Sequence, residues 1–331
     1  MNIDGRIIGW GVGCSKMDLF CCGMYRSCST WQYEIGTEVL KYLCLKNGPA
    51  EVQAIGYMTG PEYDLIRRAQ RDRSVVRILK GHEGHHSYTN AMYRGRAMGL
   101  YAHRDIRDVI FSLMYKRQQS FQEIVSKGMI HQILVNDRFW RCHPHVLVQR
   151  YDDILDDPER AVNEIAEFLH IEMPAGTSAQ LAQAYSKDAN LKRTERLQTK
   201  LAEHGLDLTN TTNAEVYDQQ TLLHWNHIRS GPTSWRSLAS AQERMVMQRL
   251  LGPWLALNGY EADDLEEIQV KSDFTKSWRL DEAQGFLRCH SREFSSAYHR
   301  WSKPLKRMLG LGAGEARSKA LEKVAQPTNS A

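Results

Sequence analysis

Short apolar segments alternate with longer stretches of helical periodicity along the first half of the chain. Residues 18–23 (DLFCCG), 75–79 (VVRIL), 99–102 (GLYA) and 146–149 (VLVQ) are apolar runs typical of buried strands. Helices are predicted over 30–46, 105–116, 122–135 and 158–169. Strands separated by helices are typical of a parallel sheet with helices on both faces. We therefore expect a three-layer α/β fold that binds its ligands at the carboxyl ends of the strands.

The second half of the chain has a different pattern. After Ile171 it is mainly helical, with a polar stretch at 206–220 and an amphipathic helix over 241–257. Beyond Tyr260 the sequence is first acidic and then basic. We therefore predict one catalytic-type domain over 1–261 and a partly helical, basic extension over 262–331 with a disordered end.

Composition excludes several classes of protein. Among 331 residues, 42% are hydrophobic and 25% charged, which excludes a disordered or collagen-like chain. The net charge of +4 is too small to predict a nucleic-acid-binding protein. Seven cysteines without a CxxC pair predict neither a disulfide framework nor a zinc site. With no recognisable secretory signal or long apolar run, we expect reduced thiols and a cytoplasmic location.

A turn rich in hydroxyl groups follows the first predicted strand. Residues 23–30 (GMYRSCST) precede a helix, whose N-terminal N–H groups can bind an anion. At Walker A spacing from Gly23, Cys28 replaces the second glycine and Ser29 replaces the lysine, while the cation lies earlier, at Arg26. The turn therefore favours an anion other than a magnesium triphosphate. The alternative is a polar turn in which Ser29 caps the helix.

Residues 25–31 (YRSCSTW) resemble the 5′-phosphosulfate loop of the sulfotransferases, P-K/R-S-G-S/T-S/T-W/F. The resemblance implies that the donor is bound by Arg26, Ser27, Cys28, Ser29, Thr30 and the adenine-stacking Trp31. Tyr25 replaces the proline of the motif, and Cys28 replaces its glycine. A cysteine carries a Cβ atom, which disfavours a backbone conformation with positive φ.

Residues 101–112 (YAHRDIRDVIFS) are similar to the strand–turn–helix of the same family, R-D/N-P-R/K-D-V-x-x-S. Its arginine and serine hold the 3′-phosphate of the nucleotide, and they fall on Arg104 and Ser112. A guanidinium group and a hydroxyl group both suit a phosphate. The alternative is a solvated network of ion pairs, which the apolar neighbours of Ser112 disfavour.

Two later segments resemble further elements of this family. Residues 148–158 (VQRYDDILDDP) are similar to its RYEDL…DP element, whose tyrosine often contacts adenine and falls on Tyr151. Tyr151 closing the sheet is the alternative. Residues 226–236 resemble the R-K-G-x-x-G-x-W loop that covers the 3′-phosphate, although the loop is one residue shorter and lacks the second glycine. Its first three positions fall on Arg229, Ser230 and Gly231.

The predicted catalytic base follows the second predicted strand. Residues 79–86 (LKGHEGHH) stand where the family has a K-T-H element, so that Lys80 and His82 match by position. A histidine titrates near neutrality and suits removal of the acceptor proton. Glu83 is the alternative base, because some carbohydrate-directed members use glutamate. His82, His85 and His86 do not form a known metal-binding pattern, so we predict no metal.

The resemblance covers about 18–261 and implies a P-loop NTPase-like sulfotransferase domain. The expected reaction moves a sulfuryl group from 3′-phosphoadenosine 5′-phosphosulfate (PAPS) to a hydroxyl or amine, with Arg26, Lys80 and His82 as catalytic residues. Two alternatives remain, a nucleotide-dependent kinase and a non-catalytic binding protein with this fold. The acceptor is unidentified, a carbohydrate or lipid among the candidates, and we expect 49–73, 83–97 and 172–225 to form its pocket.

The basic segment at 288–307 has two interpretations. It can pack on the domain or on a second subunit in a homodimer, or it can lie on an anionic membrane surface.

Overall fold

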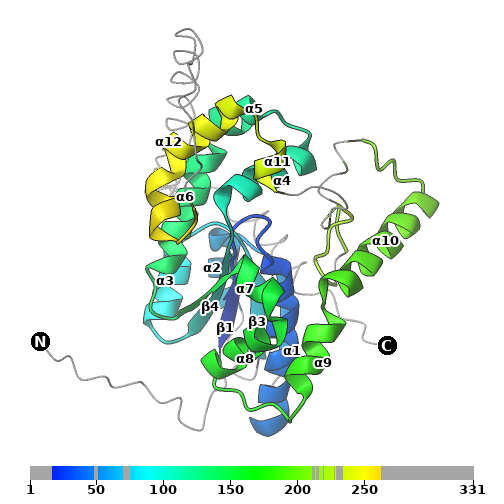
Figure 1. The fold of residues 1–331 in the computed structure, drawn as a ribbon. Helices are drawn as coiled ribbons and strands as arrows, with labels where there is room; N and C mark the ends of the chain where they lie inside the picture. Colours follow the sequence, from blue (N-terminus) through cyan, green and yellow to red (C-terminus); the bar gives the residue numbers. More distant parts are fainter. Residues whose placement is uncertain are drawn as a thin grey trace, which may run out of the picture.

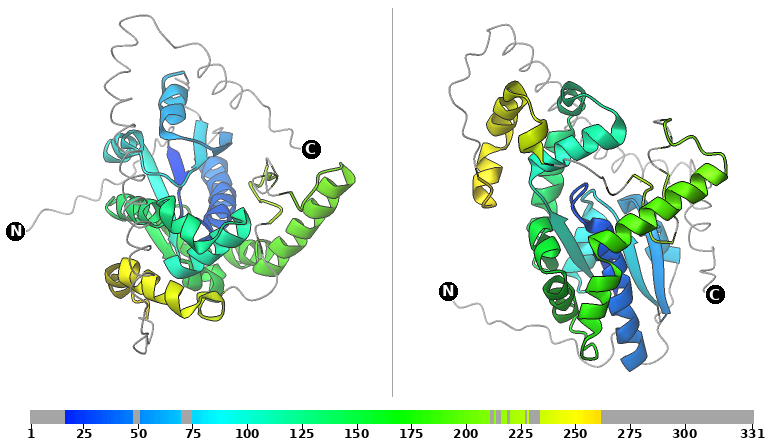
Figure 2. Two further views of the ribbon diagram at one scale, coloured as in Figure 1. Left: turned by 90° about the horizontal axis from the view of Figure 1, so that it is seen from above. Right: turned by 45° about the vertical axis from the view of Figure 1, so that its right-hand side comes forward.

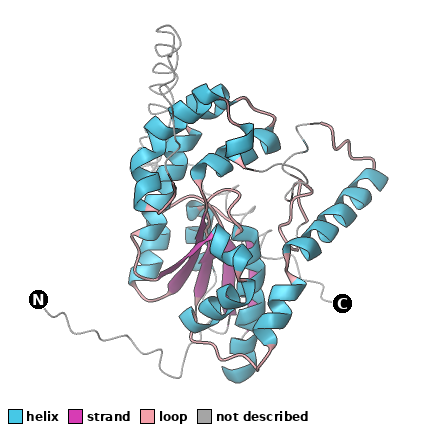
Figure 3. Ribbon diagram, viewed as in Figure 1, coloured by secondary structure: helices cyan, strands magenta, loops and turns pink. Residues whose placement is uncertain are grey.

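A parallel β-sheet forms the centre of the fold (Figures 1 and 3). The computed structural model describes residues 17–47, 51–69, 75–210, 213, 216–218, 220–226, 228 and 234–261. Within these residues the sheet has five strands in the order β2-β3-β1-β4-β5. The strands are Asp18–Cys21 (β1), Glu51–Tyr57 (β2), Val75–Lys80 (β3), Ala97–His103 (β4) and Val146–Arg150 (β5). Every neighbouring pair is parallel, which confirms the predicted fold class.

Helices cover both faces of the sheet (Figure 2). Their bounds are Ser29–Asn47 (α1), Gly60–Ala69 (α2), His86–Tyr93 (α3), Ile106–Arg117 (α4), Phe121–Ser126 (α5), Met129–Arg141 (α6), Tyr151–Asp156 (α7), Pro158–Phe168 (α8), Thr177–Ala184 (α9), Lys187–Glu203 (α10), Trp235–Leu238 (α11) and Ala241–Leu257 (α12). Leu19 and Cys21 face a core shared with α1, α7 and α8. Phe20 and Cys22 face the core shared with α2 to α6 and α12. This alternation of side chains along β1 produces the three layers.

One predicted helix was wrong, and several observed elements were not predicted. The single helix predicted over 122–135 is two helices, α5 and α6, because Gly128 between them has a left-handed backbone with φ of 75°. β2, α2 and α3 lie in segments for which we predicted neither a strand nor a helix. β2 is an edge strand with an irregularity between Ala54 and Gly56, so its apolar pattern is weak.

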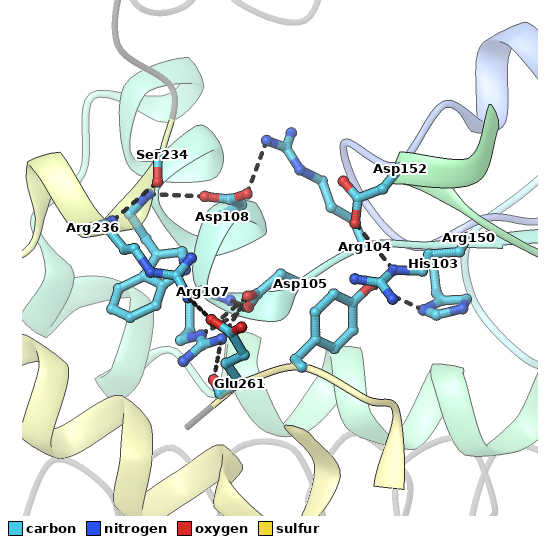
Figure 4. A network of polar contacts seen from close by, with 12 residues as sticks. His103, Arg104, Asp105, Arg107, Asp108, Arg150, Asp152, Ser234, Arg236 and Glu261 are labelled. Carbon is cyan, nitrogen blue, oxygen red and sulfur yellow. Dashed lines mark hydrogen bonds and ion pairs between the residues drawn. The ribbon is translucent and has the colours of Figure 1, made fainter. Parts of the chain in front are cut away.

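A network of charged side chains fixes α4 and α11 at the carboxyl edge of the sheet (Figure 4). Arg107 is buried, forms an ion pair with Asp105 at 2.7 Å and donates to the Glu261 carbonyl at 2.9 Å. Its guanidinium carbon lies 4.0 Å from the centre of the Trp235 ring. The backbone N–H of Trp235 in turn donates to Asp108 at 2.8 Å. The chain from 234 to 261 is thus held against α4, the helix that carries Ser112.

The structure does not describe the chain beyond Glu261, and the segment 288–307 lies outside the described residues. None of the described helices combines the length and the apolar composition needed to cross a membrane.

Candidate functional site

The turn between β1 and α1 is closely packed against the end of β4. A Cβ atom at Gly23 would lie 2.5 Å from the Ser29 Cβ and 3.2 Å from the Ala102 carbonyl oxygen, so only glycine fits. Ser27 is fully buried, with its Oγ 2.6 Å from the Met24 carbonyl oxygen and 2.7 Å from that of Ala102. These contacts fix the turn at the start of α1, which has no acidic residue in its first turn. The N-terminal charge of the α1 dipole therefore remains available to an anion.

Cys28 has the backbone conformation that the sequence argued against. Its φ is 68°, in the left-handed region, and Arg26 has a φ of 61°. A non-glycine residue in this region is strained by roughly 1–2 kcal/mol. The cysteine therefore does not prevent the turn from forming but adds strain to it. Burial raises the pKa of the Cys28 thiol to about 12, so the thiol is uncharged at neutral pH.

Arg26 points from this turn to α4. Its Nε donates to the Oγ of Ser112 at 2.8 Å, and one of its terminal nitrogens donates to the Asn226 carbonyl at 3.3 Å. Ser112 lies two turns into α4, as the motif predicted. Two predicted phosphate-binding residues therefore lie in direct contact.

Arg104 follows β4 at the same edge of the sheet. Its Nη2 is 3.2 Å from the Asp108 carboxylate (Figure 4). Its guanidinium carbon is 4.2 Å from the centre of the Tyr151 ring. The Nε of Arg104 is buried and has no hydrogen-bond partner among the described residues. A buried N–H without an acceptor is costly, so this donor is suited to an anion.

His82 is oriented by a hydrogen bond to the turn. Its Nδ1 lies 2.7 Å from the Gly23 carbonyl oxygen, and because a carbonyl only accepts, Nδ1 carries the proton. The Nε2 of a neutral ring is then an unprotonated acceptor. Burial, and secondly the charge of Lys80, lower the pKa of His82 to about 3. The ring is therefore neutral at physiological pH and its Nε2 can accept a hydrogen bond, but a pKa this far below neutrality makes it a weaker base than an ordinary histidine.

Two other predicted residues, Lys80 and Glu83, lie outside the lining of the cavity. Lys80 is 1% exposed and does not line the cavity described below, although its charge acts on Cys28 and His82. Burial lowers the pKa of Lys80 to about 8. Glu83 is exposed, accepts a hydrogen bond from Gln132 and does not line the cavity either, so the geometry disfavours it as the base.

The three histidines of 79–86 lie in different surroundings. His85 accepts a hydrogen bond from the Ser87 N–H and caps α3, while His86 is exposed. Across the part of the chain that the structure describes, no group of three His, Cys, Asp or Glu side chains is arranged to hold a metal ion.

One cavity of about 550 Å³ brings the motifs together. The predicted residues that line it are Arg26, Ser27, Cys28, Ser29, Thr30, Trp31, His82, Arg104, Ser112 and Tyr151. Its volume is typical of a site for a drug-sized ligand. Arg229, Ser230 and Gly231 lie outside the described residues, although the neighbouring Asn226 contacts Arg26.

The cavity also contains residues that sequence reasoning missed. They include Glu34, Tyr57, Lys116, Arg117, Tyr185, Lys187, Tyr217 and His224. Of the three segments expected to form the acceptor pocket, 49–73 and 172–225 contribute residues to the wall of this cavity and 83–97 does not. Lys116 could have been found from its spacing, because it lies one helical turn after Ser112. The contributions of Tyr57 and Tyr217 depend on contacts between segments far apart in the chain.

Comparison with known proteins identifies the family of this chain. The sulfotransferase domain model matches residues 16–214. No curated protein matches the chain. Among solved structures, mouse sulfotransferase SULT7A1 complexed with PAP is 13% identical, with 73% of this chain and 85% of that chain covered and a TM-score of 0.48. Retinol dehydratase in a complex with retinol and PAP is 15% identical, with 78% and 83% covered and a TM-score of 0.48. The match of the domain model to more than half of the chain shows that this protein belongs to the sulfotransferase family.

Proposed function

We propose that this sulfotransferase uses PAPS as its donor and transfers the sulfuryl group to a hydroxyl or amine of a small acceptor. The observation that carries the proposal is the convergence of Arg26, Ser112 and Arg104 on one cavity, from two segments far apart in the chain. The residues present fit a nucleotide with two anionic ends. Arg26 and the N-terminus of α1 suit the 5′-phosphosulfate, and Arg104 with Ser112 suits the 3′-phosphate. Trp31 and Tyr151 offer aromatic surfaces to the adenine.

The chain can assist the transfer in three ways. When bound, PAPS supplies the sulfuryl group, whose S–O bond to the phosphate breaks as a bond to the acceptor oxygen or nitrogen forms. Arg26 and the loop N–H groups stabilise the charge that grows on the leaving phosphate. His82 accepts the acceptor proton at Nε2, while its Nδ1–H remains bonded to Gly23. Lys80 adds positive charge from below the surface of the cavity. No step in this scheme requires a metal ion.

We also propose a domain boundary at Glu261 and a location in a reducing compartment. Helix α12 packs into the same core as α4 to α6, and we place the end of the sulfotransferase domain shortly after it, at Glu261. Cys21, Cys22, Cys28 and Cys142 are free thiols, which supports a reducing compartment such as the cytoplasm.

Formation of 3′,5′-adenosine bisphosphate (PAP) from PAPS, measured over a panel of alcohols, phenols and amines, tests the proposed reaction. We expect turnover by the wild type, and a loss of about 10²- to 10³-fold in kcat for Arg26→Ala. The matched control is Arg138→Ala, an exposed arginine of α6 outside the cavity, which should retain full activity. Transfer of phosphate from magnesium ATP without use of PAPS would contradict the proposal and favour the kinase alternative.

A further inference from the structure

The cavity side of α4 continues beyond Ser112 with two cations. Lys116 lies four residues after Ser112 and therefore on the same helical face, and Arg117 follows it. Both side chains line the cavity. The family motif ends at Ser112, so it assigns no role to either residue.

Arg117 differs from the other arginines of this region in its partners. Arg104 and Arg107 form ion pairs with Asp108 and Asp105. Arg117 forms no ion pair with any carboxylate that the structure describes, and its Nη1 donates to the sulfur of Met129 at 3.5 Å. A thioether is a weak acceptor, and a guanidinium group has five N–H donors. The half-buried Arg117 therefore retains donors for an anion.

The two cations lie beside the predicted base. The Tyr25 ring is 4.5 Å from the His82 ring between centres, and its centre is 6.0 Å from the guanidinium carbon of Arg117. Lys116 is close enough for its charge to act on His82. Tyr25 therefore lies between His82 and Arg117, so an acceptor bound at His82 would be close to Tyr25.

Cations outnumber acidic residues in the described wall of the cavity. Among the residues that the structure describes, the wall contains five lysines and arginines and one acidic residue, Glu34; the cations are Arg26, Arg104, Lys116, Arg117 and Lys187. The Glu34 carboxylate is already paired with Arg193. In the proposed reaction Arg26 and Arg104 hold the phosphates of the donor. Lys116 and Arg117 are further cations of the wall, near His82 and Tyr25 respectively.

A helix also gains stability from cations in its last turn, where Lys116 and Arg117 lie. That role explains their charge but requires neither side chain to line a cavity. If the two residues only stabilise the helix, their substitution changes the free energy of unfolding. If they bind the acceptor, their substitution changes acceptor selectivity.

We propose that Lys116 and Arg117 bind an anionic group of the acceptor, so that the preferred acceptors are hydroxyl compounds that also carry a carboxylate or another anion. This inference rests on the proposed function, because it requires transfer from PAPS at His82. It narrows the acceptor class from any alcohol or phenol to anionic ones.

Paired acceptors that differ only in charge test the proposal. We would compare kcat/KM for 4-hydroxyphenylacetate and its methyl ester, and for glucuronate and its methyl ester. Charge-assisted hydrogen bonds predict at least about a tenfold preference for each acid. In the double variant Lys116→Ala/Arg117→Ala this preference should disappear through a higher KM for the acid, with the PAP affinity unchanged. Lys127→Ala is the control, because Lys127 is paired with Glu123 and does not line the cavity.

Each outcome of this test is decisive. An ester used as well as its acid, or a preference that survives in the double variant, overturns the proposal. A lower melting temperature with unchanged selectivity assigns the two residues to helix stability alone. Where turnover is slow, calorimetric binding of acid and ester to the PAP-saturated protein gives the same comparison, and absence of acid binding contradicts the proposal. If the wild type does not bind PAP, the proposed function itself is refuted.

Discussion

The Nε of Arg26 donates a hydrogen bond to the Oγ of Ser112 at 2.8 Å, across 86 residues of the chain. The family motifs assign Arg26 to the 5′-phosphosulfate of the donor and Ser112 to its 3′-phosphate. In this structure the two side chains are in direct contact. Because Ser112 accepts this bond, its own proton is left for a phosphate oxygen. In the proposed function, Ser112 would thereby couple the position of Arg26 to recognition of the nucleotide.

Ser112→Ala should weaken PAP binding by about 10- to 100-fold, because it removes a charge-assisted hydrogen bond. Equilibrium titration of PAP measures this loss. Ser126→Ala, at the end of α5 and outside the cavity, should bind like the wild type. An unchanged affinity for PAP in Ser112→Ala would show that Ser112 does not contact the donor.

His82→Asn should lower kcat by about 10²- to 10⁴-fold and leave PAP affinity unchanged. The asparagine amide can still donate to the Gly23 carbonyl in place of Nδ1, but it cannot accept a proton. Steady-state kinetics at saturating PAPS measure the effect. Glu83→Gln should retain wild-type kcat, because Glu83 is exposed and bonded to Gln132. The reverse pattern would identify Glu83 as the base.

The low pKa of His82 also predicts a pH dependence of stability. Burial holds this pKa at about 3 in the folded protein, below the ordinary 6.5 of the unfolded chain. Between these values the unfolded chain binds a proton that the folded ring does not, so the free energy of unfolding decreases as pH falls from 6.5 towards 3. His103, also with a pKa of about 3, contributes in the same direction.

Urea denaturation at several pH values from 7 to 5 measures this dependence. His82→Asn should lose less stability on acidification than the wild type, since one titrating group is gone. His204→Asn, at an exposed histidine after α10, should follow the wild type. Identical slopes for the wild type and His82→Asn would mean that His82 titrates normally when folded.

The backbone of Cys28 predicts the effect of two substitutions. Cys28→Gly should change the free energy of unfolding by no more than about 1 kcal/mol, because relief of left-handed strain offsets the flexibility of glycine. Cys28→Val should destabilise by about 1–3 kcal/mol, since a β-branched residue is poorly accommodated at a φ of 68°. Chemical denaturation measures both, with Cys142→Val at an ordinary φ of −79° as control. Equal stability of the Gly and Val variants would contradict the assigned conformation.

Local patterns were sufficient to predict the buried strands and many of the residues that line the cavity. β1, β3, β4 and β5 are apolar throughout or nearly so, and the motif residues follow directly from their ends. β2 was missed because an edge strand needs no continuous apolar run. The break at Gly128 was missed because the helical pattern continues across it.

The remaining differences depend on contacts that no local pattern encodes. The burial of Lys80 below the cavity surface is set by the packing of the sheet, not by its position in the motif. The proximity of Arg117 to Tyr25 brings together two segments that are far apart in the chain. The strain at Cys28 was foreseen as an obstacle, but the contacts of Gly23 and Ser27 are sufficient to fix the turn.

Calorimetric titration with PAP, 5′-AMP and magnesium ATP tests most directly whether the cavity is a donor site for PAPS. We expect PAP to bind at least about tenfold more tightly than 5′-AMP, because Arg104 and Ser112 recognise the 3′-phosphate. That preference should be lost in Arg104→Ala and retained in Arg138→Ala. Equal binding of PAP and 5′-AMP, or tighter binding of magnesium ATP, would contradict the assignment of this cavity to PAPS.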